Sequence, residues 1–248
     1  MKRTVEVCAG SYEDCLNAAL GGADRVELNA ALSVGGLTPG IITLRRVKQE
    51  TDLKVICMVR PRAAGFCYTE KEKAVMFEEA KLLLQNGADG LAFGFLREDG
   101  SIECDSTKRM IDLIHEKKRE AVFHRAFDVC TDAYAAMELL ISLGADRVLT
   151  SGQRAKATEG RELLKKLQES YGDKIQILAG SGVNAENAAA LMEYTGISQV
   201  HSSCKAYLED KTTVGEYVSY AYLPAPYERC YDGVSLEAVR RLVSVLQR

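Results

Sequence analysis

Short apolar runs rich in β-branched residues alternate along the chain with longer stretches of helical periodicity. Some runs are almost entirely apolar, such as VICMV at 55–59 and IQIL at 175–178, which is typical of parallel strands covered by helices. Eight such runs predict strands at Thr4–Cys8, Arg25–Asn29, Lys54–Arg60, Gly90–Phe95, Glu120–Arg125, Arg147–Thr150, Ile175–Ala179 and Gln199–Ser203. A last helix is predicted at Ser235–Gln247.

A weak internal repeat marks every second strand. GGADRVELN begins at Gly21, NGADGLAFG at Asn86, LGADRVLTSG at Leu143 and the degraded copy TGISQVHSS at Thr195. The copies recur about every 50–65 residues, the length of two strand–helix units. Four such units close one barrel, so we predict the α/β class and a single (β/α)8 TIM barrel over residues 1–248. A doubly wound open sheet is the alternative, which the repeat and the strand count disfavour.

One long connection departs from this pattern. The tyrosine-rich stretch Lys205–Gly233, between the eighth strand and the last helix, is predicted to be irregular. Long connections of this kind are commonly functional, and this one starts at the end of the barrel where active sites lie. We expect a lid or a subunit contact, and the alternative is a solvated tail packed on the side of the barrel.

Composition excludes several classes of partner. The formal net charge is −3, so no general attraction to nucleic acid or to an anionic membrane is expected. The N-terminal residues lack an apolar stretch of signal-peptide length, and no run approaches a membrane span. The eight cysteines are scattered without a C-x-x-C pair. We therefore expect reduced thiols and a cytoplasmic location.

Polar residues gather at the predicted C-terminal ends of the strands, which meet at one mouth in such a barrel. Four of them could act as acids or bases: Glu6, Glu27, His124 and Asp128. A carboxylate inside a strand must be paired, and Arg60, Arg62 and Arg125 are the expected partners of Glu6 and Glu27. The alternative is that these groups form a structural ion-pair network.

A second set at the same mouth could bind an anion. The Gly180-Ser181-Gly182 turn precedes a predicted helix, and backbone N–H groups in such a turn suit an anionic group. The expected anion-binding set is Arg60, Arg62, Arg125, Ser151, Gly180, Ser181, Gly182, His201 and Ser202. Lysine is missing from the strand ends, which argues against a Schiff-base aldolase.

Several ordered segments together resemble one known family. GGADRVELNAALSVGGLTPG from Gly21, then RPRAAGFCYT, FHRAFD, RVLTSGQ, AGSGV and VHSS are similar to the CutC family of copper homeostasis proteins, over roughly Val5 to Ser203. The resemblance implies a cytosolic barrel, a homodimer or higher homo-oligomer, and a role in copper handling. Copper(I) prefers thiolate ligands, and the family's strand-1 cysteine is retained as Cys8, the candidate metal ligand.

Two departures from the family pattern concern the same mouth. Asn29 stands where the family commonly has a cysteine, and residues 63–65 read Ala-Ala-Gly where the family favours G-G-D. The pair of thiols expected on strands 1 and 2 is therefore absent. Three functions stay open: copper binding, an enzyme acting by acid/base chemistry on a small anionic metabolite such as a phosphorylated one, and a non-catalytic binding scaffold.

Overall fold

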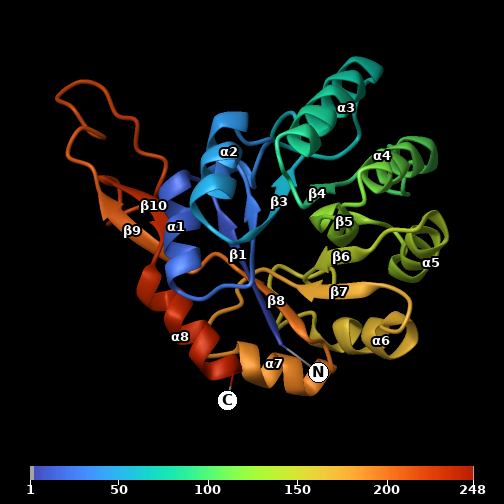
Figure 1. Ribbon diagram of the computed structural model, residues 1–248. Coiled ribbons are helices and arrows are strands. Elements are labelled where there is room, and N and C mark those ends of the chain that lie inside the picture. The colour runs from blue at the N-terminus through green and yellow to red at the C-terminus, as the bar shows by residue number, and fades with distance from the viewer. Residues whose placement is uncertain (1–2, 248) are drawn as a thin grey trace.

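Eight parallel strands close into a barrel in the computed structural model, which describes residues 3–247 (Figure 1). Each strand pairs with the next in the chain, and β8 returns to pair with β1. The predicted fold class is confirmed. The strands are β1 (Thr4–Ala9), β2 (Arg25–Leu28), β3 (Lys54–Met58), β4 (Gly90–Phe93), β5 (Glu120–Phe123), β6 (Arg147–Thr150), β7 (Gln176–Ala179) and β8 (Gln199–Ser202).

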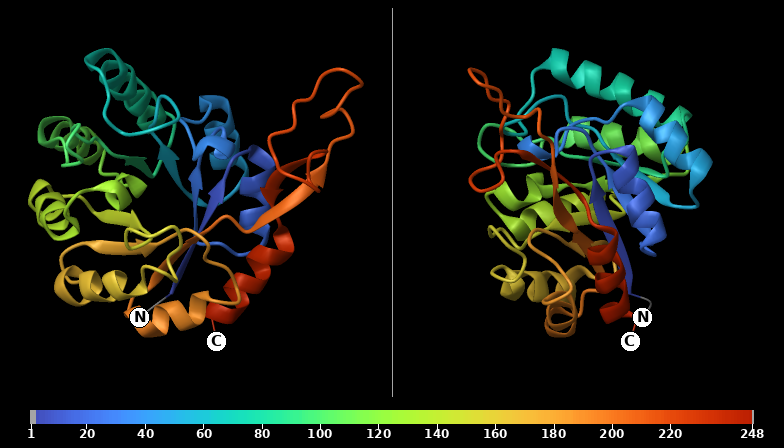
Figure 2. Two further views of the ribbon diagram at one scale, coloured as in Figure 1. Left: turned by 180° about the vertical axis from the view of Figure 1, so that it is seen from behind. Right: turned by 90° about the vertical axis from the view of Figure 1, so that its left-hand side faces the viewer.

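Helices surround the barrel and cover the outer face of its strands (Figures 1 and 2). They are α1 (Tyr12–Leu20), α2 (Ile41–Glu50), α3 (Glu70–Gln85), α4 (Cys104–Glu116), α5 (Ala133–Leu143), α6 (Arg161–Tyr171), α7 (Ala188–Thr195) and α8 (Leu236–Leu246), with short 3₁₀ turns η1 (Leu32–Val34) and η2 (Arg125–Val129). Strand residues such as Val55 and Cys57 join the main core with these helices. The alternate residues Ile56 and Met58 form a separate apolar cluster with Ala92 and Val122, as the two-residue period of a strand requires.

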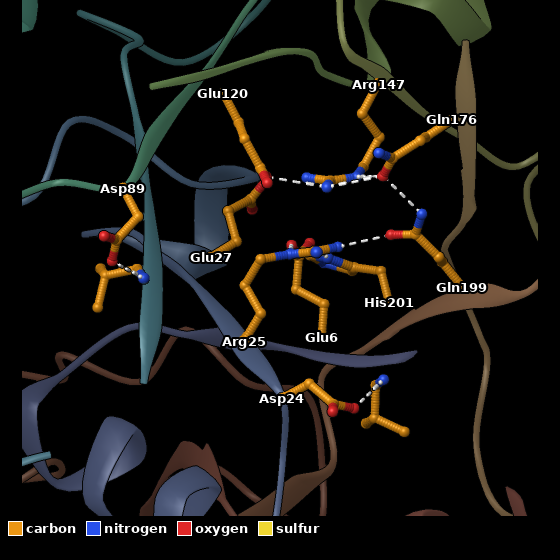
Figure 3. Close-up of polar contacts among 12 residues, drawn as sticks. Glu6, Asp24, Arg25, Glu27, Asp89, Glu120, Arg147, Gln176, Gln199 and His201 are labelled. Carbon is orange, nitrogen blue, oxygen red and sulfur yellow. Dashed lines mark hydrogen bonds and ion pairs between the residues drawn. The ribbon is translucent and has the colours of Figure 1, made fainter. Parts of the chain in front are cut away.

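A polar network occupies another part of the barrel interior (Figure 3). It runs from Glu120 through Arg147, Gln176, Gln199 and Arg25 to Glu6, and ends at His201. The links measure 2.9 Å from Arg147 Nη2 to Glu120, 2.7 Å from Gln199 Nε2 to Gln176, and 2.7 Å from His201 Nδ1 to Glu6. The network joins six of the eight strands.

The buried glutamates are not paired as the sequence predicted. Glu6 is bound by Arg25 and His201, and Glu27 accepts a hydrogen bond from Asn29 at 3.0 Å. The predicted arginine partners were wrong because they lie beyond the strand ends, whereas Arg25 faces Glu6 directly in the β1–β2 register. Glu6 does belong to a structural ion-pair network, but its partners are Arg25 and His201, and the network lies deeper than the mouth, where the alternative had Arg60, Arg62 and Arg125 closing the barrel.

The sequence predicts an irregular connection over Lys205–Gly233, and the structure corrects this prediction in part. Its ends form β9 (Lys205–Glu209) and β10 (Cys230–Val234), an antiparallel ribbon that leaves the barrel and carries the arm 210–229 (Figures 1 and 2). Val234 N donates to Asp14 Oδ1 of α1 at 2.7 Å, which anchors the base of the ribbon. Both faces of β9 are largely exposed, so its sequence lacks the alternation of apolar and polar residues that signals a strand.

None of the helices between residues 3 and 247 combines the length and the apolar character that crossing a bilayer requires.

We predict that Glu6→Gln lowers the free energy of unfolding by about 3 kcal/mol, because it leaves the buried Arg25 without its carboxylate. Urea denaturation followed by circular dichroism measures the change. The matched control is Asp112→Asn, which removes the carboxylate of an exposed ion pair with Lys108 and should cost less than about 1 kcal/mol. Equal stability of the Glu6→Gln variant and the wild type would show that the network does not stabilise the barrel.

Candidate functional site

A cavity of about 290 Å³ lies at the C-terminal ends of the strands, the end that carries the active sites of such barrels. Strand-end residues form its floor, and loop residues and the β9–β10 ribbon form its walls. The lining residues are Cys8, Glu27, Leu32, Gly35, Met58, Arg60, Phe66, His124, Arg125, Leu149, Ser181, Gly182, His201, Ser203, Lys205 and Asp232.

Three potential metal ligands converge on one side of this cavity. The Cys8 thiol, a Glu27 carboxylate oxygen and a His201 ring nitrogen all lie within 4.8 Å of one another. They come from the adjacent strands β8, β1 and β2, and Cys8 faces Glu27 directly in the β1–β2 register. Among residues 3–247 this is the one group of three such donors. The sheet itself therefore assembles the candidate metal site.

Glu6 orients the histidine of this group. Its carboxylate binds His201 Nδ1 at 2.7 Å, which leaves Nε2 as the ring nitrogen available to a metal ion. A carboxylate behind a metal-binding histidine fixes the ring and increases its basicity. Burial opposes a charge on His201, but hydrogen bonds to Cys8 and Glu6 and the charge of Glu27 together hold its pKa well above the usual value. Glu6 was predicted as a catalytic group, and the structure places it as a support for His201.

Asn29 holds the other two members of the group. Its Nδ2 donates to Glu27 Oε2 at 3.0 Å and lies 3.6 Å from Cys8 Sγ. Burial raises the pKa of Glu27, and desolvation likewise raises the pKa of the Cys8 thiol. A raised pKa favours the protonated form of each group, so a metal ion that binds them competes with protons.

Arg60 and His124 line the opposite part of the cavity, from the ends of β3 and β5. Arg60 Nη1 donates to the carbonyl oxygens of Val34 and Gly36, both at 3.0 Å. His124 Nδ1 accepts a hydrogen bond from Ala126 N at 3.2 Å. Burial, assisted by the charge of Arg60, lowers the pKa of His124 to about 3. His124 is therefore a neutral ring at physiological pH.

Asp128 and Ser151, two other predicted site residues, lie outside the cavity lining. The Asp128 carboxylate accepts hydrogen bonds from Thr150 Oγ1 at 2.6 Å and from Ser151 N and Oγ, and it pairs with Arg125 at 2.7 Å. These contacts tie η2 to the loop after β6. They leave the carboxylate fully engaged rather than facing a ligand.

Three further predicted residues also lie outside the lining. Arg62 pairs with Glu72 and stacks over the ring of Tyr68, and Ser202 Oγ donates to Val183 O at 2.6 Å. Gly180 has a steric role, since a Cβ at this position would meet Leu149 at 2.6 Å. Of the predicted anion-binding set, the structure brings Arg60, Arg125, Ser181, Gly182 and His201 to the cavity.

The sequence missed Asp232, which lines the cavity from β10. Its carboxylate pairs with Lys205 of β9 at 2.6 Å, so the ribbon contributes an ion pair to the rim. Asp232 follows β8 by almost thirty residues and belongs to no barrel strand. Only the unusual length of that connection pointed to a role at the mouth.

The closed parallel barrel and its cysteine–histidine–carboxylate group define a TIM-barrel protein with a candidate metal site at the mouth. The CutC family model matches residues 3–206. A CutC family protein of Treponema denticola is 43% identical over 243 residues, covering 98% of each chain. The human copper homeostasis protein cutC homolog is 40% identical over 202 residues, covering 82% of this chain and 73% of its own.

A solved structure agrees with these relatives. The crystal structure of a CutC protein from Streptococcus agalactiae superposes with a TM-score of 0.76 at 29% identity, covering 81% of this chain and 98% of its own. The chain belongs to the CutC family.

We predict that His124 stays neutral from pH 7.5 down to about 5, because its pKa in the folded protein is lowered to about 3. A long-range ¹H–¹⁵N correlation spectrum of the histidine rings should show Nδ1 unprotonated and Nε2 protonated throughout this range. The unfolded chain takes up this proton near the usual pKa of about 6.5. The unfolded state therefore binds a proton that the folded state excludes, and the free energy of unfolding decreases as the pH falls from about 6.5 toward 3. Protonation of the folded-state ring with a midpoint near 6.5 would contradict the buried, neutral assignment.

Proposed function

We propose that this protein takes part in copper homeostasis by binding monovalent copper at Cys8, Glu27 and His201. The convergence of these three donors within 4.8 Å carries the proposal. Membership of the CutC family supports it, because relatives such as the human one are named for copper homeostasis. The same support favours this function over the enzyme and scaffold alternatives.

Two of the three donors, Cys8 and His201, suit the chemistry of copper(I). Thiolate is a soft ligand that selects copper(I), and imidazole is also a good copper ligand. Two donors on one ion are separated by at most about 4.6 Å when metal–ligand distances are about 2.0–2.3 Å, close to the span of this group. Only small side-chain movements are needed for the three groups to share an ion.

His201 compensates for the missing second thiol. Asn29, at the position where the family commonly has a cysteine, directs its amide toward Cys8 and Glu27. An amide nitrogen is a hydrogen-bond donor and has no lone pair to offer a metal ion. The two copper-preferring donors in this chain are therefore one cysteine and one histidine, and Asn29 positions the carboxylate beside them.

The state of the cysteines supports a cytoplasmic location. All eight are free thiols, and Cys8 is only half-buried. Free thiols persist in reducing compartments and pair in oxidising ones. We therefore propose a cytoplasmic location for the copper site.

We predict tight binding of one equivalent of copper(I) in an anaerobic titration against a chromogenic copper(I) chelator. Cys8→Ser should weaken copper(I) binding by at least about 100-fold. Loss of a residue that only supports a metal ligand lowers the affinity about 10- to 100-fold, and loss of the ligand itself should lower it more. The matched control is Cys67→Ser, which removes an exposed thiol outside the cavity and should leave the affinity unchanged. If the Cys8→Ser variant and the wild type bound copper(I) with the same affinity, Cys8 would be excluded as a ligand and the proposed site would be wrong. Displacement of the copper by equimolar zinc would contradict copper as the metal.

We also propose that the arm 210–229 makes the subunit contact of a homo-oligomer. The arm projects beyond the barrel (Figure 2) and exposes 88% of Tyr217, 61% of Val218 and 81% of Tyr220. Tyrosine is enriched at protein interfaces, and most soluble oligomers are assembled from identical copies. A second copy of this chain is therefore the proposed occupant of the arm.

We predict that the double variant Tyr217→Ser, Tyr220→Ser lowers the mass measured by light scattering after size exclusion to that of a monomer. Tyr134→Ser removes an exposed tyrosine from α5 instead and should leave the mass of the wild-type oligomer unchanged. A monomeric wild type, or an oligomer that survives the double substitution, would exclude the arm as the subunit contact.

A further inference from the structure

Arg60 and His124 form a second group in the cavity that the metal site does not use. The metal donors come from β1, β2 and β8, whereas these two residues follow β3 and β5 across the cavity. Both pack against Phe66, with 5.1 Å from the guanidinium carbon of Arg60 to the centre of the Phe66 ring and 4.9 Å between the ring centres of Phe66 and His124.

Arg60 is a buried cation without a carboxylate. Its exposed fraction is 6%, and the hydrogen bonds of its guanidinium group go to carbonyl oxygens, those of Val34, Gly36 and Ala64. Within residues 3–247 no carboxylate lies at ion-pair distance from it, and its Nε has no hydrogen-bond partner. Burying a charge is costly unless an opposite charge compensates it.

The other cations of the cavity are already neutralised. Arg125 pairs with Asp128 at 2.7 Å, Lys205 with Asp232 at 2.6 Å, and His201 with Glu6 at 2.7 Å. Arg60 is therefore the uncompensated charge of the lining in the part of the chain that the structure describes.

His124 adds an unpartnered hydrogen-bond donor next to this charge. Its Nδ1 accepts from the Ala126 amide, so the proton of the neutral ring resides on Nε2. That nitrogen is buried and has no partner, in a side chain that is only 2% exposed. Because the Arg60 charge helps keep the ring neutral, His124, a residue of the cavity lining, has one unpartnered N–H donor and no free acceptor.

We infer that the cavity binds a small molecule through an oxyanion, a carboxylate or a phosphate group, held between Arg60 and His124. An oxyanion supplies the missing negative charge to Arg60 and an acceptor to His124 Nε2–H, and such charge-assisted hydrogen bonds are short and strong. The cavity of about 290 Å³ is at the lower end of the usual size for ligand sites, about 300–1,000 Å³, which limits the ligand to a small metabolite. This site goes beyond the copper function and requires no metal.

The test uses the full-length, metal-free protein and two probes, inorganic phosphate and acetate, titrated separately at constant ionic strength and pH. Calorimetry should give a Kd of about 1 mM or below for at least one probe. In the same samples the His124 Nε2–H signal of the wild type should shift on saturation, while the ring signals of the exposed His115 stay in place. Saturation by phosphate alone identifies a phosphate subsite, and saturation by acetate alone identifies a carboxylate subsite.

Variants locate the bound anion. Arg60→Met should weaken binding of the probe about 10- to 100-fold, the cost of losing a hydrogen bond to a charged group. Arg45→Met, an exposed arginine of α2, is the matched control and should bind normally. If Arg60→Met fails to fold because its carbonyl contacts are lost, the shift of the wild-type His124 Nε2–H signal on addition of the probe is sufficient to test the inference. The inference is overturned if neither probe moves that signal at about ten times the stated Kd, or if folded Arg60→Met binds as tightly as the wild type.

Discussion

The carboxylate of Glu6, enclosed by Arg25 and His201, is the interaction on which the rest of this structure depends. An unpaired charge buried in the barrel interior would destabilise the fold, whereas a carboxylate with two cationic partners is stable there. Arg25 extends this pairing through Gln199 and Gln176 to Arg147. The interior is thus filled by a polar network on one side and by an apolar cluster around Ile56 on the other.

The same carboxylate connects the stability of the barrel with the chemistry of its mouth. Glu6 binds Arg25 with one oxygen and His201 with the other, so the group that stabilises the sheet also orients a candidate metal ligand. Cys8 and Glu27 are held by backbone register and by Asn29, and none of the three donors sits on a flexible loop. A site built on strands is already in position before any ion arrives.

The sequence predicted the fold well because the signals it depends on are local. Apolar runs, helical periodicity and the internal repeat that begins at Gly21 located all eight strands, and the strand-end rule placed Cys8, Glu27, His124 and His201 at one mouth. Pairing could not be predicted in the same way. Whether Glu6 contacts Arg25 or Arg60 depends on strand register, which no local pattern contains.

The remaining errors have the same origin. The Asp128 carboxylate looked available in the sequence, but the loop after β6 folds back onto it. Asp232 reaches the cavity only because β10 pairs with β9 after an excursion of about twenty residues. Contacts made by segments that return to the barrel from a distance are decided by tertiary structure, so the sequence alone indicated neither of them.

The two ends of the β9–β10 ribbon have different structural roles. At its base, Lys205 and Asp232 complete the cavity rim, and Val234 is fastened to Asp14. Beyond the last ribbon pair, Asp210 N still bonds Arg229 O at 2.8 Å, so the chain enters and leaves the arm through neighbouring positions. The arm is therefore an insert that begins and ends beside the ribbon, so a partner that binds the arm can do so without displacing the cavity rim.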